Sequence, residues 1–171
     1  RVPEENILGE INGGYKLGLE WIGFARWVVG ARAVGMAERL LQMAIDYSKE
    51  RYTFGKPIAE NQAIQWPIAD SAVEIEATRW LVLNAAFTLD QGDDNRHLAS
   101  MAKLYGSNMG NRVVDRVLQI HGGMGYTREL PIERWYREAR LWRIYDGTDE
   151  IQRMIISRNL LKGNVKIGQF I

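Results

Sequence analysis

The sequence predicts an all-α protein: an up-and-down four-helix-type bundle with extra short helices. Two observations lead to this prediction. Apolar residues recur at spacings of three and four along most of the chain, which is the period of amphipathic helices. The alternation of apolar and polar residues that is typical of strands is absent after residue 13.

The length and composition narrow the class of protein. The 171 residues are enough for one ordinary domain, and 46% apolar with 25% charged residues excludes wholesale disorder. A net charge of +1 gives no basic surface for nucleic acid. There is no cysteine for a disulfide or a thiol nucleophile, and two isolated histidines predict no metal site. No apolar run is long enough for a transmembrane segment.

The first expected helix is unusually long. Residues 1–13 carry one proline and two glycines, so they read as an extended segment and a turn. From about Tyr15 to Arg51 the sequence predicts one helix of roughly 35 residues, which would span about 50 Å. Its apolar stripe consists of Val29, Ala33, Met36, Leu40, Ala44 and Tyr47.

Two more long helices follow. One is expected from about Ala59 to Gln91, where Pro67 means that the helix either starts near Trp66 or carries a kink. The other is expected from about Asp94 to Ile120, and the glycines of the 122–125 segment end it.

Two shorter helices complete the bundle. The first runs from about Pro131 to Trp142, with the proline in the first turn, where its missing N–H is tolerated. The second runs from about Thr148 to Lys162. Thr148 is its expected N-cap, and two acidic residues in the first turn suit the positive end of the helix dipole.

The first linker with chemical content is Arg51-Tyr-Thr-Phe-Gly-Lys56, which Gln62 follows. A planar guanidinium, a threonine hydroxyl and a glycine turn can together hold a phosphate group. The alternative is a plain helix C-cap with basic residues that the helix dipole favours.

The second linker is Gln119-Ile-His-Gly-Gly-Met-Gly-Tyr126. Its three glycines let a ligand approach the backbone, whose N–H groups can bind an anion. It matches neither a P-loop nor a dinucleotide fingerprint. The alternative is a tight turn between helices, with His121 as a structural histidine.

The third linker is Arg143-Ile-Tyr-Asp146-Gly-Thr148-Asp-Glu150-Ile-Gln-Arg153. A carboxylate before a glycine, at the start of a helix, can act as a general base on a rigid turn. The alternative is that Asp146 and the glycine only make the turn.

In order and spacing, these three motifs resemble the C-terminal domain of the acyl-CoA dehydrogenases, and the likeness runs through essentially the whole chain. The opening Arg1-Val-Pro-x-x-Asn-Ile-Leu-Gly9 is similar to the segment in which that family's middle β-domain leads into the helical domain. The resemblance implies that residues 1–13 are the end of a preceding β-domain or linker. It also implies that residues 14–171 form the helical bundle, and that an N-terminal helical domain and the β-domain are absent from this chain.

Members of this family bind FAD and oxidise an acyl-CoA thioester to the trans-2-enoyl-CoA. A carboxylate takes the α-proton, and a hydride passes from Cβ to the flavin. The resemblance implies that one group of residues meets a flavin held mainly by a neighbouring subunit, whereas Thr148 and Glu150 contact the flavin from the subunit's own side. That group comprises Arg51, Thr53, Phe54, Gln62, Gln119, Gly122 and Gly123.

The base is where this chain departs from the family pattern. Most members have Glu immediately before the Gly-Thr of the third motif, where this chain has Asp146. A minority carry the Glu just before the position of Arg26, where this chain has Ala25. The resemblance therefore makes Asp146 the expected base and Arg26 a residue that orients it.

Three alternatives follow from this departure. Under the first alternative the protein is a nitroalkane-oxidase-like flavoprotein oxidase. Under the second it is a catalytically inactive homologue that acts as an assembly module, and under the third it is a plain helical interaction bundle. A shared flavin site implies a homo-oligomer, either a dimer or a dimer of dimers, and an electron-transferring flavoprotein is the expected electron acceptor. The expected location is the cytoplasm of a bacterium or the mitochondrial matrix of a eukaryote, and the isolated chain is expected to be inactive.

Overall fold

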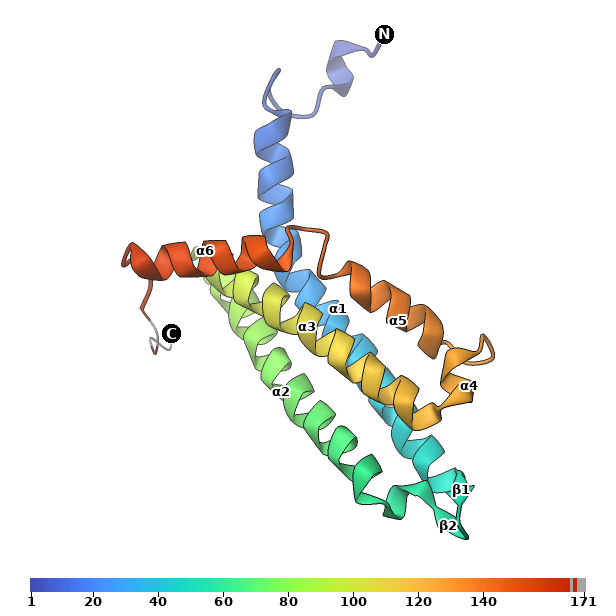
Figure 1. Ribbon diagram of the computed structural model, residues 1–171. Coiled ribbons are helices and arrows are strands. Elements are labelled where there is room, and N and C mark those ends of the chain that lie inside the picture. Colours follow the sequence, from blue (N-terminus) through green and yellow to red (C-terminus); the bar gives the residue numbers. More distant parts are fainter. Residues whose placement is uncertain (167, 169–171) are drawn as a thin grey trace.

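The structure, a computed structural model, describes residues 1–166 and 168; the other positions of the predicted 14–171 domain lie outside the described residues. Three long helices, each antiparallel to the one before it in the chain, run beside one another, down, up and down in the view of Figure 1. They are α1 (Gly14–Glu50), α2 (Gln62–Asp90) and α3 (Arg96–His121). Helix α5 (Ile132–Leu141) packs on α3 and α1, and α6 (Asp149–Leu161) crosses the first part of α3. The predicted all-α bundle is confirmed.

The core lies mainly along the seam between α1 and α3. The predicted α1 stripe is buried from Val29 to Ala44, with Ala33, Leu40 and Ala44 fully inaccessible. Met109, Val113 and Val117 of α3 face this stripe within one continuous apolar cluster. Burial of these side chains holds the long helices together.

The two helices approach each other most closely at a pair of glycines. A Cβ atom added to Gly106 of α3 would lie 2.8 Å from the Cα atom of Gly30 in α1. A Cβ atom added to Gly30 would lie 2.9 Å from the carbonyl oxygen of Ala102. Only glycine therefore allows the backbones to pack at this distance.

The first linker contains a short hairpin that the absence of strand alternation does not reveal. Tyr52–Thr53 (β1) and Lys56–Pro57 (β2) pair in an antiparallel hairpin. Phe54 and Gly55, at its tip, both have positive φ angles (50° and 81°), as a type I′ hairpin turn requires. Strands of two residues are too short to show an alternating pattern.

The helix boundaries also differ in detail. A separate 3₁₀ turn, η2 (Ile58–Glu60), precedes α2, which begins at Gln62 and contains Pro67 in its interior. The glycine segment after α3 forms one further helical turn, α4 (Gly123–Tyr126). Gly122 separates the two helices with a φ angle of 58°, which glycine adopts readily.

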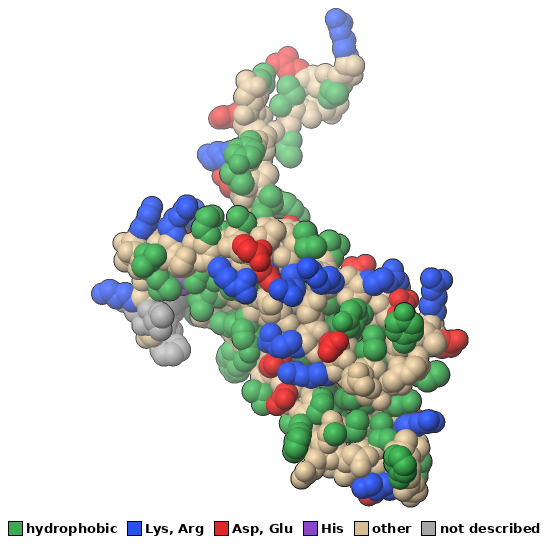
Figure 2. Space-filling model, viewed as in Figure 1, with side chains coloured by type: hydrophobic (Ala, Val, Ile, Leu, Met, Phe, Trp, Pro, Cys, Tyr) green, Lys and Arg blue, Asp and Glu red, His purple; other side chains and the backbone are tan. Residues whose placement is uncertain are grey.

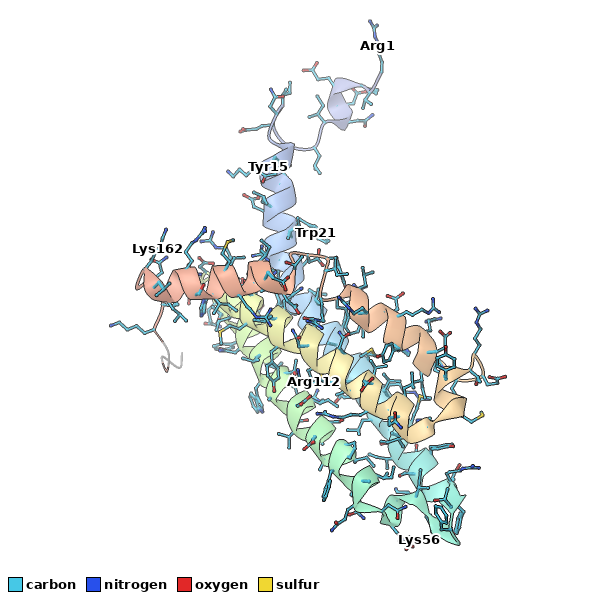
Figure 3. All side chains as sticks on the ribbon, in the orientation of Figure 1. Arg1, Tyr15, Trp21, Lys56, Arg112 and Lys162 are labelled. Carbon is cyan, nitrogen blue, oxygen red and sulfur yellow. The ribbon has the colours of Figure 1, made fainter. Side chains whose placement is uncertain are left out.

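The first part of α1 extends beyond the bundle. Residues 1–13, with the short 3₁₀ turn η1 (Glu4–Asn6), lie at the end of this extension. Tyr15 and Trp21 are exposed on it (Figure 3), and hydrophobic side chains follow it in the space-filling view (Figure 2). None of the described helices combines the length and apolar character that crossing a membrane needs.

The close approach of α1 and α3 gives a testable prediction. Gly106→Ala should lower the free energy of unfolding of this chain by about 1–3 kcal/mol, because the new methyl group must displace the α1 backbone. Gly35→Ala is the control: no atom lies within 4 Å of its added Cβ. That variant should be stabilised by about 0.5–1 kcal/mol because alanine favours helix. Urea unfolding measures both, and a stabilised Gly106→Ala variant contradicts the packing described.

Candidate functional site

The first two motifs meet at one end of the bundle. A cavity of about 580 Å³ lies between the end of α1, the hairpin and the start of α4. Arg51 and Thr53 line one side of it, and Gly122 and Gly123 line another. Arg51 is exposed and forms no ion pair within the part of the chain that the structure describes. Its guanidinium is therefore available to an anionic group.

His121 forms part of the wall of this cavity. It is buried, its Nδ1 lies 2.8 Å from the carbonyl oxygen of Val117, and its ring stacks on Tyr47 with centroids 4.4 Å apart. Burial lowers the pKa of His121 below its usual value. This is the structural histidine that one of the sequence alternatives describes, and it joins the ends of α1 and α3.

Three other expected cofactor residues lie outside the cavity lining. Phe54 is fully exposed at the hairpin tip, Gln62 begins α2, and Gln119 lies in the last turn of α3. All three are exposed near the same end of the bundle (Figure 1), where a large ligand that extends out of the cavity could reach them.

The third motif lies toward the other end of the bundle, in the turn between α5 and α6. Asp146 is half-buried and has a φ angle of 54°, and Gly147 after it has a φ angle of 88°. Arg26 of α1 is close enough for its charge to interact with Asp146. Burial lowers the pKa of Arg26, and the attraction to Asp146 partly opposes that effect.

The start of α6 follows directly. Thr148 is the N-cap, as expected, and its hydroxyl accepts a hydrogen bond from the backbone N–H of Ile151 at 3.4 Å. Hydrogen bonds from its own backbone N–H and from the Thr148 hydroxyl lower the pKa of the exposed Glu150. The structure thus brings Arg26, Asp146, Thr148 and Glu150 to one end of α6.

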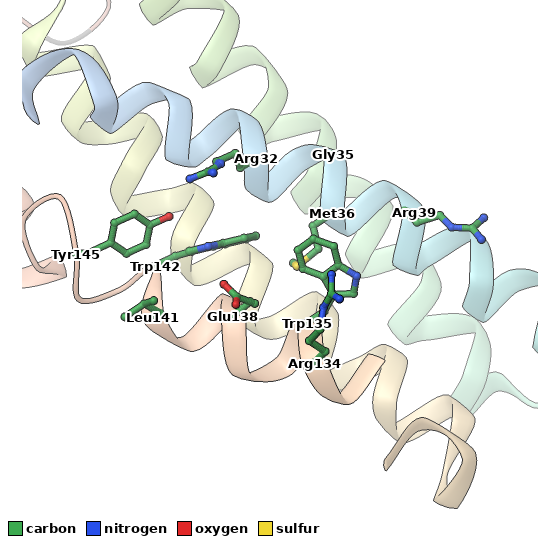
Figure 4. A pocket seen from close by; sticks show the side chains of 10 residues that line it. All are labelled: Arg32, Gly35, Met36, Arg39, Arg134, Trp135, Glu138, Leu141, Trp142 and Tyr145. Atoms are coloured by element: carbon green, nitrogen blue, oxygen red, sulfur yellow. The ribbon is translucent and has the colours of Figure 1, made fainter. Parts of the chain in front are cut away.

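A groove of about 880 Å³ leads from this turn between α1 and α5 (Figure 4). Met36, Trp135 and Trp142 give it an apolar floor, and Tyr145 closes the end next to Asp146. Burial raises the pKa of Tyr145, against the opposing effect of the nearby Arg32 guanidinium.

Beneath the turn lies a buried charge cluster centred on Asp149, the first residue of α6. The Asp149 carboxylate accepts hydrogen bonds from Arg143 Nε at 2.8 Å, Asn108 Nδ2 at 2.9 Å and Ser107 Oγ at 3.0 Å. Lys103 Nζ lies 3.6 Å from the same carboxylate. The burial of Asp149 acts to raise its pKa, but these donors outweigh it and the pKa is lowered.

The sequence alone does not predict this cluster. Lys103 is completely buried, and desolvation lowers its pKa against the attraction of Asp149. The only sign of this burial in the sequence is that the lysine directly follows an alanine of the apolar stripe of α3. In the sequence, Asp149 is only an acidic residue that suits a helix N-terminus, and that role does not require its side chain to be buried.

The two groups of expected site residues are far apart within one chain. Arg26 lies on α1 close to Asp146, and Arg51 directly follows the last residue of α1 at the cavity. At about 1.5 Å per residue, roughly 37 Å of helix separates the two arginines. No group of three potential metal ligands occurs among the described residues. The chain therefore carries two separate groups of candidate site residues.

Residues 12–161 match the acyl-CoA dehydrogenase C-terminal domain family. The chain is 44% identical over 162 residues to cyclohexane-1-carbonyl-CoA dehydrogenase of Geobacter metallireducens, covering 95% of this chain and 43% of that protein. Identity and both shares are the same for the caffeyl-CoA reductase-Etf complex subunit CarC of Acetobacterium woodii. Butyryl-CoA dehydrogenase from Megasphaera elsdenii superposes with a TM-score of 0.87 at 41% identity, over 94% of this chain and 42% of that one.

The chain therefore belongs to the acyl-CoA dehydrogenase family, as its C-terminal helical domain. It spans less than half the length of these relatives.

The buried cluster gives the second prediction. Asp149→Ala should lower the free energy of unfolding by about 3–5 kcal/mol, because it leaves the buried Lys103 without its counter-ion. Asp94→Ala is the control, since Asp94 pairs with Arg96 on the surface and its loss should cost less than about 1 kcal/mol. Chemical unfolding measures both. Equal effects of the two substitutions would show that the Asp149 cluster contributes no more than a surface pair.

Proposed function

We propose that this chain is the C-terminal domain of an FAD-dependent enzyme that oxidises an acyl-CoA thioester to its trans-2-enoyl-CoA. The observation that carries the proposal is the position of Asp146, which lies on a rigid turn next to Arg26 and at the start of α6. The names of the relatives, which act on CoA thioesters, support the same class of substrate.

The residues at the cavity end fit an anionic cofactor. Arg51 offers a guanidinium that pairs with no carboxylate among the described residues, and Gly122 and Gly123 leave open space where any other residue would place a Cβ atom. Phe54, fully exposed with a positive φ angle, fits an aromatic side chain that a ligand or a partner covers. Arg51 and Thr53 would hold the pyrophosphate, and Gln62 and Gln119 the adenosine side. When bound, FAD supplies the hydride acceptor.

At the other end, Asp146 accepts the α-proton of the thioester. Arg26 is our candidate for orienting its carboxylate, since the two opposite charges lie close enough to attract each other. The groove next to Tyr145 is our candidate for the acyl-CoA: Met36, Trp135 and Trp142 offer apolar surface to the acyl chain, and arginines such as Arg32 and Arg39 line it as well. Thr148 and Glu150 would contact the flavin of the same subunit.

The distance between the two groups of candidate site residues supports the proposal that the protein is an oligomer. Arg51 and Arg26, the neighbour of Asp146, are too far apart along α1 for both groups to serve one flavin within one chain. A second copy must then supply the cavity residues, so that the dimer, or a dimer of dimers, is the unit that binds FAD. We further propose that residues 1–13 end a preceding β-domain, and that an electron-transferring flavoprotein is the partner, as in the complex that names one relative.

The base assignment gives a prediction for the full-length protein. Asp146→Asn should lower the rate of flavin reduction by an acyl-CoA at least about a hundredfold, as expected for the loss of a positioned base. Stopped-flow absorbance under anaerobic conditions measures it. The exposed Asp90→Asn is the control and should keep the full rate. Near-normal reduction in the Asp146 variant removes this residue from the mechanism.

The cofactor assignment gives a separate prediction. Arg51→Ala should release FAD faster and lower its occupancy, because the pyrophosphate loses its charged partner. Arg137→Ala is the control, since Arg137 pairs only with Glu133 on the surface of α5 among the described residues. The flavin content of the purified protein and its off-rate are the measurements. Values equal to those of the parent protein rule out the phosphate clamp.

A further inference from the structure

The turn that carries Asp146 is held from below by a residue of α6. Gln152 is completely buried, and its Nε2 donates hydrogen bonds to the carbonyl oxygens of Asp146 at 3.2 Å and of Gly147 at 2.9 Å. These two carbonyls belong to the two peptide groups that directly follow the candidate base. One side-chain amide therefore holds both peptides at once.

The fit between this amide and the turn is close. A Cβ atom added to Gly147 would lie 2.7 Å from Gln152 Nε2. The glycine is thus required both by its positive φ angle and by the space that the glutamine occupies. Asp146 itself has a positive φ angle, which is a conformation that a side-chain-bearing residue keeps only where its surroundings enforce it.

The ends of the same turn are closed by different contacts. The backbone N–H of Asp149 donates to the carbonyl oxygen of Arg143 at 3.2 Å, and Arg143 Nε donates to the Asp149 carboxylate at 2.8 Å. Ser107 and Asn108 fix that carboxylate to α3. The charge cluster thus anchors α6 to the bundle, and Gln152, one turn further along α6, reaches the tip of the turn from this anchor.

Hydrogen bonding does not compensate fully for the burial of the Gln152 amide. Its Oε1 is buried and has no hydrogen-bond partner within the described structure, so an apolar side chain of the same shape would avoid a desolvation cost. We therefore attribute the presence of a glutamine here to the two hydrogen bonds that its Nε2 donates to the turn.

We propose that Gln152 is a positioning residue for the reaction: its amide fixes the backbone of Asp146 and Gly147, and thereby the direction in which the Asp146 carboxylate points. This inference rests on the proposed role of Asp146 as the base. It assigns to Gln152 no contact with substrate or flavin. The effect of losing it is a misdirected base rather than a lost fold.

The test compares three variants of the full-length, FAD-loaded protein. Gln152→Met keeps the size of the side chain and removes both hydrogen bonds to the turn. Thr88→Val is the matched control, since Thr88 is buried in α2 and the change removes its hydroxyl bond to the Asn84 carbonyl, away from the turn. Asp146→Asn tests the base itself.

We expect flavin reduction at saturating acyl-CoA to be slowed between about tenfold and a hundredfold in Gln152→Met, the effect of a displaced catalytic group. The apparent dissociation constant of the thioester should stay within about threefold, since ground-state binding is untouched. Hydrogen–deuterium exchange of the peptide that covers residues 143–150 should accelerate in Gln152→Met and not in Thr88→Val.

The outcomes separate the two proposals. If Asp146→Asn abolishes reduction while Gln152→Met keeps its rate, the positioning role is wrong and the base assignment stands. If the Gln152→Met rate falls only as far as that of Thr88→Val, or exchange in the turn does not change, the glutamine is an ordinary structural residue. If Asp146→Asn keeps its rate, the base assignment fails first, and the positioning role fails with it.

Discussion

The arrangement of this domain depends on one buried carboxylate. Asp149 is almost completely inaccessible, and an isolated charge in an apolar bundle is very costly, so its surroundings must supply counter-charges and donors. Arg143, Ser107, Asn108 and Lys103 do so from two sides. These contacts fix the start of α6 on α3, and with it the turn that presents Asp146. A buried cluster of charged and polar side chains therefore lies next to the turn that carries the candidate catalytic group.

The second constraint is the length of α1. A continuous helix of 37 residues places Arg26 beside Asp146 and Arg51 beside the glycine segment, at two distant places on one rigid element. No side-chain movement can bring these residues to one ligand. Under the proposed function, oligomerisation is therefore a condition of cofactor binding, because each flavin needs the base end of one copy and the cavity end of another.

The sequence predicts the fold well because the signals are local. The apolar period of α1 and α3, the N-cap Thr148 and the glycines that end the helices act within a few residues, and the structure confirms them. The hairpin with Phe54 at its tip is not predicted, because its strands are too short to show an alternating pattern. The sequence does not predict the buried charge cluster around Asp149 either. Lys103 and Asp149 are 46 positions apart in the numbering, and no local rule pairs a lysine on one helix with the first residue of another. The proximity of Arg51 to Gly122, in contrast, was expected from the family resemblance and is seen in the cavity.

The central step of the proposed reaction is the removal of an α-proton from a CoA thioester by a carboxylate. The most direct measurement is to mix the full-length, FAD-loaded protein anaerobically in D₂O with a series of acyl-CoA thioesters, from short through branched to hydroxylated chains. Flavin absorbance and the α-deuterium content of the thioester are followed together. We predict that at least one thioester bleaches the flavin and acquires deuterium at Cα. A fully flavin-loaded protein that none of them bleaches, and that leaves every α-position unlabelled, would contradict the account.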